Sequence, residues 1–582
     1  MNTPPIIRLR RLAWAPLRLR TSLEAARWMK AVQHTPAVQA RLLDRLLVDA
    51  AQTDFGRDFS LGRVRTLEDF RAALPIAGYE RARPYVERVA RGETHALFPR
   101  GTPIHMFCMT SGTTGSPKYL PVTDALLKAF RRGWHLWGAH ALRDHREAFG
   151  AKILQIASRM DEQITPCGKP AGAMSGLTAH MQRRVVKWLY VLPIEALYAG
   201  DTASKYYLAC RLGLHDRWVM PVTANPSTLL NLARTMDEHK EDLVRDLADG
   251  TLTRNVALDE PHRSRVESRL KANPRRAREL EAAIQTTGRL YPKDVWHLPL
   301  IGTWKGGTLS LYLREMPKYW GEAPIRDIGL IASETRVSIP LETEDSAGIL
   351  EPTGTFFEFV PEAEIDAENP TALLAHETEP GKKYFLILTT PGGLFRYNIH
   401  DLVEVVDRLG PAPVIRFLNK GEHVSNLTGE KLTEYQVTRA TNDAVMRLSL
   451  PVRNYCLCPT WDTVPHYSLL VEEDEVSAVS AGRLAAEVDR SLQALNMEYE
   501  TKRKSGRLNA VHVKVLPRGT WRTYDTRAIE AQSGRAEQYK HKFLANDVEF
   551  ERQFSVCACH GPSTTGRPGR SQTPSEDEGA NT

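Results

Sequence analysis

The sequence predicts a two-part α/β protein: a large layered α/β N-terminal domain with an antiparallel β subdomain, followed by a small mobile α+β C-terminal domain. Three observations support this class. Short apolar runs alternate with helical patterns through the first half of the chain, closely spaced strand-like runs follow, and a second alternation begins after residues 420–422. A chain of 582 residues is also too long for a single hydrophobic core.

The large domain is expected over residues 1–418. Helical periodicity predicts helices at 22–52, 67–73, 83–91, 124–146, 227–248 and 263–287. Strands are predicted between them at 152–157, 217–222, 295–301 and 327–331. Closely spaced strands at 355–360, 384–389, 402–406 and 414–418 then predict the antiparallel subdomain.

The second part begins after a short connection. Residues 419–423 are a plausible hinge, and residues 424–558 have normal domain length for an α+β lid. Its predicted order is a helix (430–448), two strands (454–460 and 467–472), a helix (482–496) and a strand (511–516). Residues 559–582 read as a disordered tail of low complexity.

Composition is typical of a globular protein, with 42% hydrophobic and 25% charged residues. No apolar run reaches the roughly 18 residues of a transmembrane helix. The net charge of +7 gives no indication of nucleic-acid binding, although it would help attract an anionic substrate.

Seven scattered cysteines predict no disulfide framework and favour a reducing, cytoplasmic location. Cys557, Cys559 and His560 lack a second ligand pair at zinc-site spacing, so ordinary thiols are the favoured interpretation.

The N-terminus is basic and leucine-rich between Arg8 and Arg20. It lacks the apolar core of a secretory signal. A transit peptide or a weak membrane-surface contact is one interpretation, and an amphipathic helix of the main domain is the favoured one.

A loop at 110–118, with the sequence TSGTTGSPK, lies between a strand-like run and a helix-like run. Glycines let the backbone approach phosphate oxygens, hydroxyls and amides donate hydrogen bonds, and Lys118 adds positive charge. The glycine spacing differs from that of the NTPase P-loop. The pattern is typical of the phosphate loop of enzymes that activate carboxylic acids as acyl-adenylates, so ATP is the expected nucleotide.

Three further motifs follow in the order that an adenylating enzyme requires. Residues 329–334 are a strand-like run whose small residues leave room for adenine and whose Glu334 could hold Mg²⁺. Residues 392–402 place Asp401 where a carboxylate could accept hydrogen bonds from a ribose diol. His400 could act as a general base, but a packed turn histidine is the favoured interpretation.

The last motif, at 426–434, opens the second part. It is either a glycine turn that starts a helix or a swing point that brings Lys431 to the reaction centre.

With these motifs the chain resembles the auxin-responsive-promoter (Gretchen Hagen) family of acyl-acid amido synthetases, within the adenylate-forming superfamily that includes firefly luciferase. The resemblance extends over residues 20–545, including segments at 79–88, 356–360, 495–508 and 538–540.

The resemblance implies a role for each matching residue. Ser111, Thr113 and Thr114 would contact phosphate together with Lys118. Ala332, Ser333 and Glu334 would line the adenine and metal site, and Asp401 would bind ribose. Lys431 and Lys540 would approach the α-phosphate or the acyl-adenylate from the small domain.

Two segments depart from the family pattern. The ribose segment usually reads Tyr-Arg-Val-Gly-Asp, whereas residues 397–401 here read Tyr-Asn-Ile-His-Asp. Ile331 stands where the plant enzymes have a tyrosine. The first difference leaves the role of Asp401 in place but changes the loop around it.

The implied reaction activates a small carboxylic acid as acyl-AMP and then transfers the acyl group to an amine, favoured to be that of an amino acid. Transfer to coenzyme A or a carrier thiol, and a non-catalytic nucleotide-binding protein, are the alternatives. The acid itself is not readable. Trp134, Trp137, Met174 and Met181 could wall its pocket, but such residues are equally typical of an ordinary core.

Overall fold

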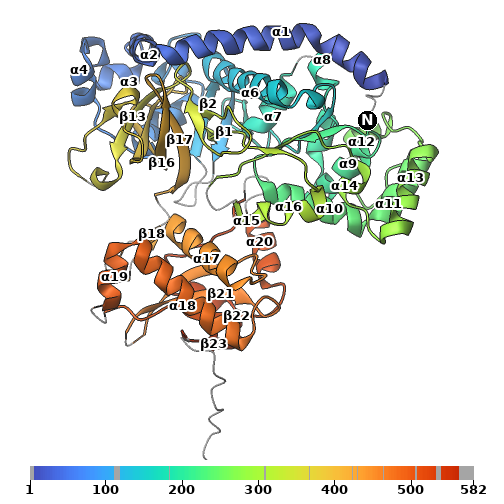
Figure 1. Ribbon diagram of the computed structural model, residues 1–582. Coiled ribbons are helices and arrows are strands. Elements are labelled where there is room, and N and C mark those ends of the chain that lie inside the picture. The colour runs from blue at the N-terminus through green and yellow to red at the C-terminus, as the bar shows by residue number, and fades with distance from the viewer. Residues whose placement is uncertain are drawn as a thin grey trace, which may run out of the picture. The chain divides into compact units, whose positions relative to one another are not determined.

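The computed structural model describes residues 5–110, 118–182, 184–306, 310–365, 367–421, 424–425, 427–428, 430, 432–462, 464–504, 507–531 and 539–562. The chain divides into two compact units (Figure 1). The first comprises Met1–Glu422 and Asp525–His541, and the second comprises His423–Tyr524 and Lys542–Thr582. The expected small domain was continuous over 424–558, whereas the contacts of Asp525–His541 group this segment with the first unit.

The main helices of the first unit are α1 (Pro5–Gln33), α2 (Thr35–Ala50), α3 (Asp54–Asp58), α4 (Leu67–Ala73), α5 (Arg83–Ala90), α6 (Asp124–Asp144), α7 (Met174–His180), α8 (Arg184–Lys187), α9 (Thr202–Gly213), α10 (Pro226–Glu238), α11 (Lys240–Asp249), α12 (Glu260–Glu267), α13 (Pro274–Thr287), α14 (Pro292–Val295), α15 (Ser310–Leu313) and α16 (Met316–Trp320). Among the described residues, no helix has the length and hydrophobicity needed to span a bilayer.

The helix ends follow local sequence signals. The predicted helix at 22–52 is two helices, because Pro36 stands in the first turn of α2 and restarts the chain there. The predicted helix at 263–287 is likewise divided, with Asn273 capping α13 through its side chain and Pro274 opening the helix. In α4, Thr66 and Asp69 form a reciprocal capping box.

Parallel strands make up one sheet region of the first unit. β3 (Lys152–Leu154) pairs in parallel with β6 (Val219–Pro221), and β7 (Ile301–Gly302) pairs in parallel with β8 (Ile325–Arg326). A parallel bridge between Val222 and Gly302 connects the two pairs. Helices α9 to α14 and α16 share one hydrophobic cluster with these strands, which confirms the layered α/β prediction.

Two predicted strands are shorter than expected. Residues 295–301 contribute only Ile301 to a strand, because α14 occupies the start and Pro299 interrupts the remainder. Residues 327–330 lie outside any strand, and the Asp327 carboxylate accepts from the amides of Lys305 and Gly329.

The antiparallel subdomain is a seven-stranded sheet in the order β11-β12-β17-β16-β15-β13-β14. The strands are β11 (Ser338–Ile339), β12 (Gly348–Leu350), β13 (Phe356–Pro361), β14 (Leu373–Leu374), β15 (Lys383–Thr389), β16 (Tyr397–Leu409) and β17 (Ala412–Lys420). Every pair is antiparallel, as predicted. The inner face of this sheet packs into the largest core cluster together with α2, α5 and α6.

A second, four-stranded sheet has the order β2-β1-β5-β4. Its strands are β1 (Ile104–Thr110), β2 (Lys118–Thr123), β4 (Gln163–Ile164) and β5 (Pro170–Gly172). β1 and β2 are antiparallel, whereas β1 and β5 are parallel.

The second unit contains β18 (Val424–Ser425), β19 (Leu432–Thr433), α17 (Glu434–Leu448), β20 (Cys456–Thr460), β21 (His466–Glu472), α18 (Ala478–Leu495), α19 (Met497–Lys504), β22 (His512–Leu516), α20 (Thr520–Ala531) and β23 (Ala558–His560). α20 runs across the residue boundary at Asp525. The sheet order is β20-β21-β22-β23, with α17 packed against α18. α17 starts at Glu434 rather than at 430, because Thr433 and Gln436 form a capping box there.

The expected tail began at 559, but residues 558–560 form β23 and pair with β22. Residues 563–582 lie outside the described part of the chain. All seven cysteines are free thiols, as the scattered spacing predicted.

Candidate active site

The expected phosphate loop lies in the chain between two paired antiparallel strands. β1 and β2 flank it, with Thr110 paired to Lys118 across the ladder. Residues 111–117 lie outside the described residues, and with them the expected phosphate contacts of Ser111, Thr113 and Thr114. The structure does place Lys118 at the start of β2.

Lys118 is half-buried, and its Nζ lies 5.8 Å from the centre of the Tyr79 ring. The Tyr79 hydroxyl donates to the backbone oxygen of Tyr119 at 2.7 Å. Burial raises the pKa of the Tyr79 hydroxyl, so that it remains a neutral donor. Tyr79 therefore fixes the strand beside Lys118 and offers an aromatic face to its ammonium group.

The expected adenine and metal residues form a tight hairpin. β9 (Ile331–Ala332) and β10 (Thr335–Arg336) pair directly, which leaves Ser333 and Glu334 as the turn. Ala332 and Ser333 are half-buried and Glu334 is buried. The segment before the hairpin requires Gly329, whose φ is +84° and where a Cβ atom would lie 2.4 Å from the Ser338 oxygen.

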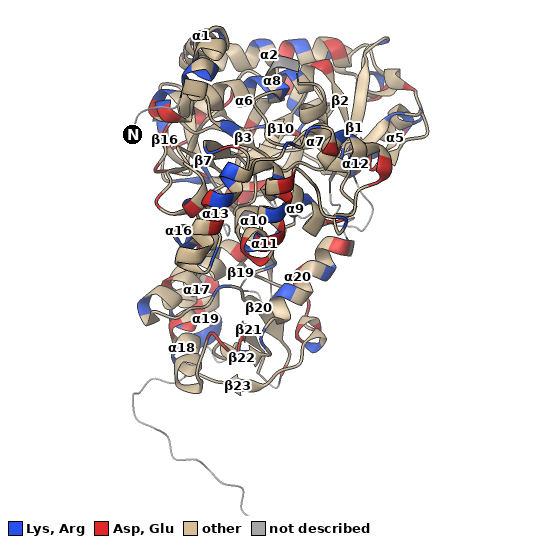
Figure 2. Cartoon of the chain, turned by 90° about the vertical axis from the view of Figure 1, so that its right-hand side faces the viewer, with Lys and Arg blue, Asp and Glu red and all other residues tan. Residues whose placement is uncertain are grey.

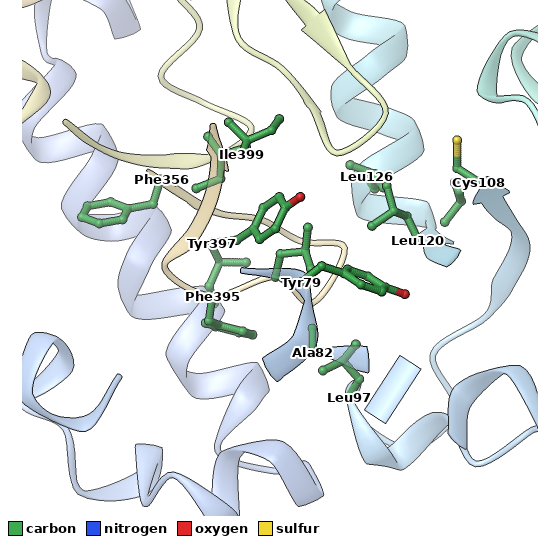
Figure 3. Close-up of a cluster of buried hydrophobic side chains, with 14 of the residues drawn as sticks. Tyr79, Ala82, Leu97, Cys108, Leu120, Leu126, Phe356, Phe395, Tyr397 and Ile399 are labelled. Atoms are coloured by element: carbon green, nitrogen blue, oxygen red, sulfur yellow. The ribbon is translucent and has the colours of Figure 1, made fainter. Parts of the chain in front are cut away.

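The expected ribose segment begins at Tyr397, the first residue of β16. The Tyr397 hydroxyl donates to Oε1 of Glu334 at 3.4 Å. This bond connects the ribose segment with the adenine hairpin. Figure 3 shows Tyr397 and Tyr79 in the same cluster of buried side chains, together with Phe395 and Leu120.

Asp401 is buried in β16, four residues after Tyr397. The preceding His400 has φ of +61°, a left-handed conformation that a glycine adopts without strain. Its amide donates to Oδ1 of Asn398 at 2.8 Å, and its carbonyl accepts from the Gly421 amide at 2.7 Å. The loop thus keeps a left-handed turn at the position where the family pattern has glycine, and Asn398 stabilises that turn.

Lys540 belongs to the Asp525–His541 segment of the first unit. Its Nζ lies 5.2 Å from the ring of Trp304 and 5.7 Å from that of Phe417, while its side chain is exposed. The Trp304 indole in turn donates to the carbonyl of Gly329 at 2.8 Å. The Trp304 side chain therefore contacts both Lys540 and Gly329, and Gly329 belongs to the segment that leads into the adenine hairpin.

Asp525 fixes the residues on both sides of Lys540. The Tyr539 hydroxyl donates to Asp525 Oδ1 at 2.7 Å, and His541 Nδ1 lies 2.8 Å from the same oxygen. Asn225 Nδ2 also donates to the Tyr539 carbonyl at 2.6 Å. Lys431, the other expected lysine, lies outside the described residues.

Sequence reasoning gave no role to Tyr397 or Trp304. Tyr397 is the first residue of the expected ribose segment, and the sequence offered only its phenol, a potential hydrogen-bond donor, as an indication of a role. Trp304 stood in no motif, so only tertiary contacts reveal it. Of the suggested acid-pocket walls, Trp137 is buried and donates to the Asp327 carbonyl, and Met174 lies in the main core cluster.

A magnesium ion that accompanies ATP usually takes one or two protein carboxylates, with phosphate oxygens and water as its other ligands. Glu334 is a buried carboxylate whose Oε1 accepts from the Tyr397 hydroxyl, and a single carboxylate fits one such ligand. The described residues contain no group of three or more metal-ligating side chains.

Three successive sequence matches define the class of this protein. The GH3 family N-terminal domain matches residues 25–325, the central domain matches 348–420 and the C-terminal domain matches 435–549. The chain belongs to the GH3 family, which confirms the resemblance drawn from the motifs.

Relatives match along most of their length. The chain is 26% identical to a probable indole-3-acetic acid-amido synthetase of Oryza sativa subsp. japonica, over 88% of each chain. It is 24% identical to a jasmonoyl–L-amino acid synthetase of the same species, over 83% of this chain and 88% of the relative. It is 23% identical to a 4-substituted benzoates-glutamate ligase of Arabidopsis thaliana, over 83% and 88%.

The fold is also that of a solved relative. The GH3.15 acyl acid amido synthetase structure superposes with a TM-score of 0.81 and 20% identity, covering 93% of this chain and 97% of the other. This similarity confirms the predicted fold class.

Proposed function

We propose that this protein is an ATP-dependent acyl-acid amido synthetase, which activates a carboxylic acid as acyl-AMP and transfers the acyl group to the amine of an amino acid. The observation that carries the proposal is the ordered match of all three GH3 domains along residues 25–549. The relatives named above are amido synthetases or amino acid ligases that differ in their acid.

In the first step, a carboxylate oxygen of the acid attacks the α-phosphorus of ATP. The bond from that phosphorus to the bridging oxygen breaks, and pyrophosphate leaves. Ser111, Thr113, Thr114 and Lys118 would hold the phosphates by hydrogen bonds and charge. Glu334 would hold Mg²⁺, which would neutralise charge on the phosphate oxygens.

The nucleoside would be held by the two segments that Tyr397 joins. Ala332 and Ser333 leave a small-residue surface for the adenine ring. Asp401 would accept from the ribose hydroxyls, since a carboxylate offers two acceptor oxygens to a vicinal diol. The hydrogen bond from Tyr397 to Glu334 supports a fixed spacing between the strand that would hold the ribose and the hairpin that would hold adenine and Mg²⁺.

In the second step, an uncharged amine attacks the acyl carbon, the bond to the phosphate oxygen breaks and AMP leaves. The amine nitrogen loses a proton in this step. Lys540 or Lys431 would stabilise negative charge on the α-phosphate during adenylation and need not remain during aminolysis. The second unit would move between the two steps.

The test uses the purified full-length chain. A panel of carboxylic acids is screened by acid-dependent exchange of labelled pyrophosphate into ATP, and each active acid is then supplied with amino acids or with coenzyme A. We expect exchange with at least one acid and an amide product with at least one amino acid. Product with coenzyme A alone would establish the thiol ligase, and ATP binding without exchange would establish a binding protein.

A double variant tests the nucleotide site. Ser111→Ala with Lys118→Ala should abolish exchange, because each lost donor typically costs about 2.7–4 kcal/mol at a transition state. Lys128→Ala, an exposed lysine on α6, is the matched control. Full exchange in the folded double variant would refute the phosphate-loop assignment.

A further inference from the structure

Helix α1 has two apolar faces, and only one of them is used in folding. Ile7, Trp14 and Trp28 are buried, and Trp28 meets the His140 ring of α6 edge-on with 6.0 Å between ring centres. α1 packs along α6, on the outside of the first unit (Figure 1). This face anchors the helix to the domain.

The opposite face carries an exposed stripe of leucines. Leu9, Leu12, Leu19 and Leu23 are 61%, 74%, 64% and 52% exposed. Together with exposed Pro16 they follow one another at alternating intervals of three and four residues, which places them on one side of a helix. Single exposed leucines are ordinary on protein surfaces, but an aligned series along one helix indicates an interaction site.

The charges around this stripe have one sign. α1 contains seven basic residues and one acidic residue, so its formal side-chain charge is 7 − 1 = +6. The one acidic residue, Glu24, is bound to His135 Nδ1 at 3.0 Å. Arg8, Arg20 and Arg27 are exposed and stand one helical turn from Leu12 or Leu23. Figure 2 marks the Lys and Arg residues of α1 in blue.

The remaining arginines of the N-terminal half serve the domain. Arg10 binds Asp216 at 2.7 Å, and Arg11 donates to the carbonyl of Phe149 at 2.7 Å. Five of the seven basic residues of α1 therefore fall into two groups, one that holds the helix in place and one that borders the exposed leucines.

We propose that α1 binds the surface of an anionic lipid bilayer, with the helix axis parallel to the membrane and the stripe of Leu9, Leu12, Pro16, Leu19 and Leu23 inserted among the acyl chains. Leucines on one face and bordering arginines are the combination that places a helix at the headgroup boundary. Each bordering arginine would face anionic headgroups.

Charge decides against a second copy of this chain as the occupant. The spacing of the exposed leucines, alternately three and four residues, would also suit the pairing of α1 with α1 of a second copy. The bordering arginines of the two copies would then face each other with like charge. Nucleic acid would satisfy the arginines and leave the leucines in water. An anionic bilayer satisfies both groups.

The experiment is flotation of the full-length protein with vesicles of phosphatidylcholine, with and without phosphatidylglycerol. We expect binding only to the anionic vesicles, and weaker binding at high salt because screening acts on the arginine contacts. Neither ATP nor an acid substrate is needed, so the result does not depend on the proposed catalytic function.

Two variants separate the contributions. Leu12→Ser with Leu19→Ser should reduce binding about ten-fold or more, since apolar insertion is lost. Arg8→Gln with Arg20→Gln should reduce it about five-fold for each arginine. The matched controls are Val479→Ser, a 69% exposed residue of α18, and Arg275→Gln with Arg278→Gln on the exposed face of α13.

Three outcomes would overturn the proposal. One is equal flotation with neutral and anionic vesicles. Another is unchanged flotation of the leucine variant. The third is a concentration-dependent dimer in sedimentation velocity that the leucine variant abolishes, which would make a second copy the occupant.

Discussion

The Tyr397 hydroxyl and Oε1 of Glu334, 3.4 Å apart, join two segments that are 63 residues apart in the chain. One is the first residue of a long antiparallel strand and the other is the turn of a two-stranded hairpin. Both side chains are buried. The contact fixes the relation between the expected adenine and metal residues and the strand that carries Asp401.

Replacing Glu334 by Gln should raise the magnesium concentration needed for pyrophosphate exchange about ten-fold, because a neutral amide is a poorer ligand for a hard cation. The measurement is a magnesium titration at saturating ATP. Glu342→Gln, at an exposed glutamate further along the chain, is the control. Identical titrations for the Glu334 variant and the parent would remove Glu334 from the metal site.

Replacing Asp401 by Asn should raise the KM for ATP about ten-fold with a smaller change in kcat, since an amide offers one acceptor oxygen where the carboxylate offers two. Asp407→Asn, an exposed position on the same strand, should leave KM unchanged. An unaltered ATP affinity in the Asp401 variant would assign Asp401 a purely structural role.

Replacing Lys540 by Ala should slow adenylation about 100-fold and slow aminolysis of a supplied acyl-adenylate much less, because Lys540 would stabilise the extra charge of the pentavalent α-phosphorus centre, which forms only in adenylation. Rapid-quench measurement of the two half-reactions tests this expectation. Lys542→Ala is the control, since Lys542 Nζ lies over the ring of Phe550 in the second unit. Equal slowing of both steps would contradict the assigned role.

Replacing Glu358 by Gln should destabilise the first unit by about 3–5 kcal/mol, because it leaves the buried Arg396 without its counter-charge. Arg396 Nε donates to Glu358 Oε2 at 2.9 Å, and both side chains are almost fully buried. Urea unfolding measures the loss. Glu379→Gln, at an exposed pair with Lys382, should change stability by less than about 1 kcal/mol. A comparable small effect at Glu358 would show that the pair contributes little.

The stability of the second unit should depend on pH through Glu475. Burial raises the pKa of Glu475 from 4.5 to about 7, against the opposing hydrogen bond and charge of Arg453. The folded state therefore binds this proton more tightly than the unfolded state. The contribution of Glu475 to the free energy of unfolding is fully present below pH 4.5 and is lost as the pH rises through about 7.

Glu475→Gln should remove this pH dependence, which amounts to about 1–3 kcal/mol in the free energy of unfolding over that pH range. Hydrogen exchange of the β20–β22 amides at several pH values, corrected for intrinsic rates, measures it. Glu473→Gln is the control in the same turn. A parallel slope in parent and Glu475 variant would contradict the prediction.

Local signals in the sequence were sufficient for much of the fold. The antiparallel strands of the central sheet could be predicted because each alternates between faces and ends at turn residues. Helix starts were less accurate where a cap residue or a proline decided them, as at Thr433 and Pro36. The short parallel strands β7 and β8 could not be delimited, because they are defined by bridges to distant segments such as that between Val222 and Gly302.

The same division applies to the candidate site. The sequence alone determined the family, the order of the motifs and the residue types in them, because those features lie within short stretches of chain. Only the tertiary structure decided that Tyr397 bonds to Glu334, that Trp304 lies between Lys540 and Gly329, and that the leucines of α1 remain exposed. Each of these depends on which segments fold against each other, and periodicity along the chain carries no information on that choice.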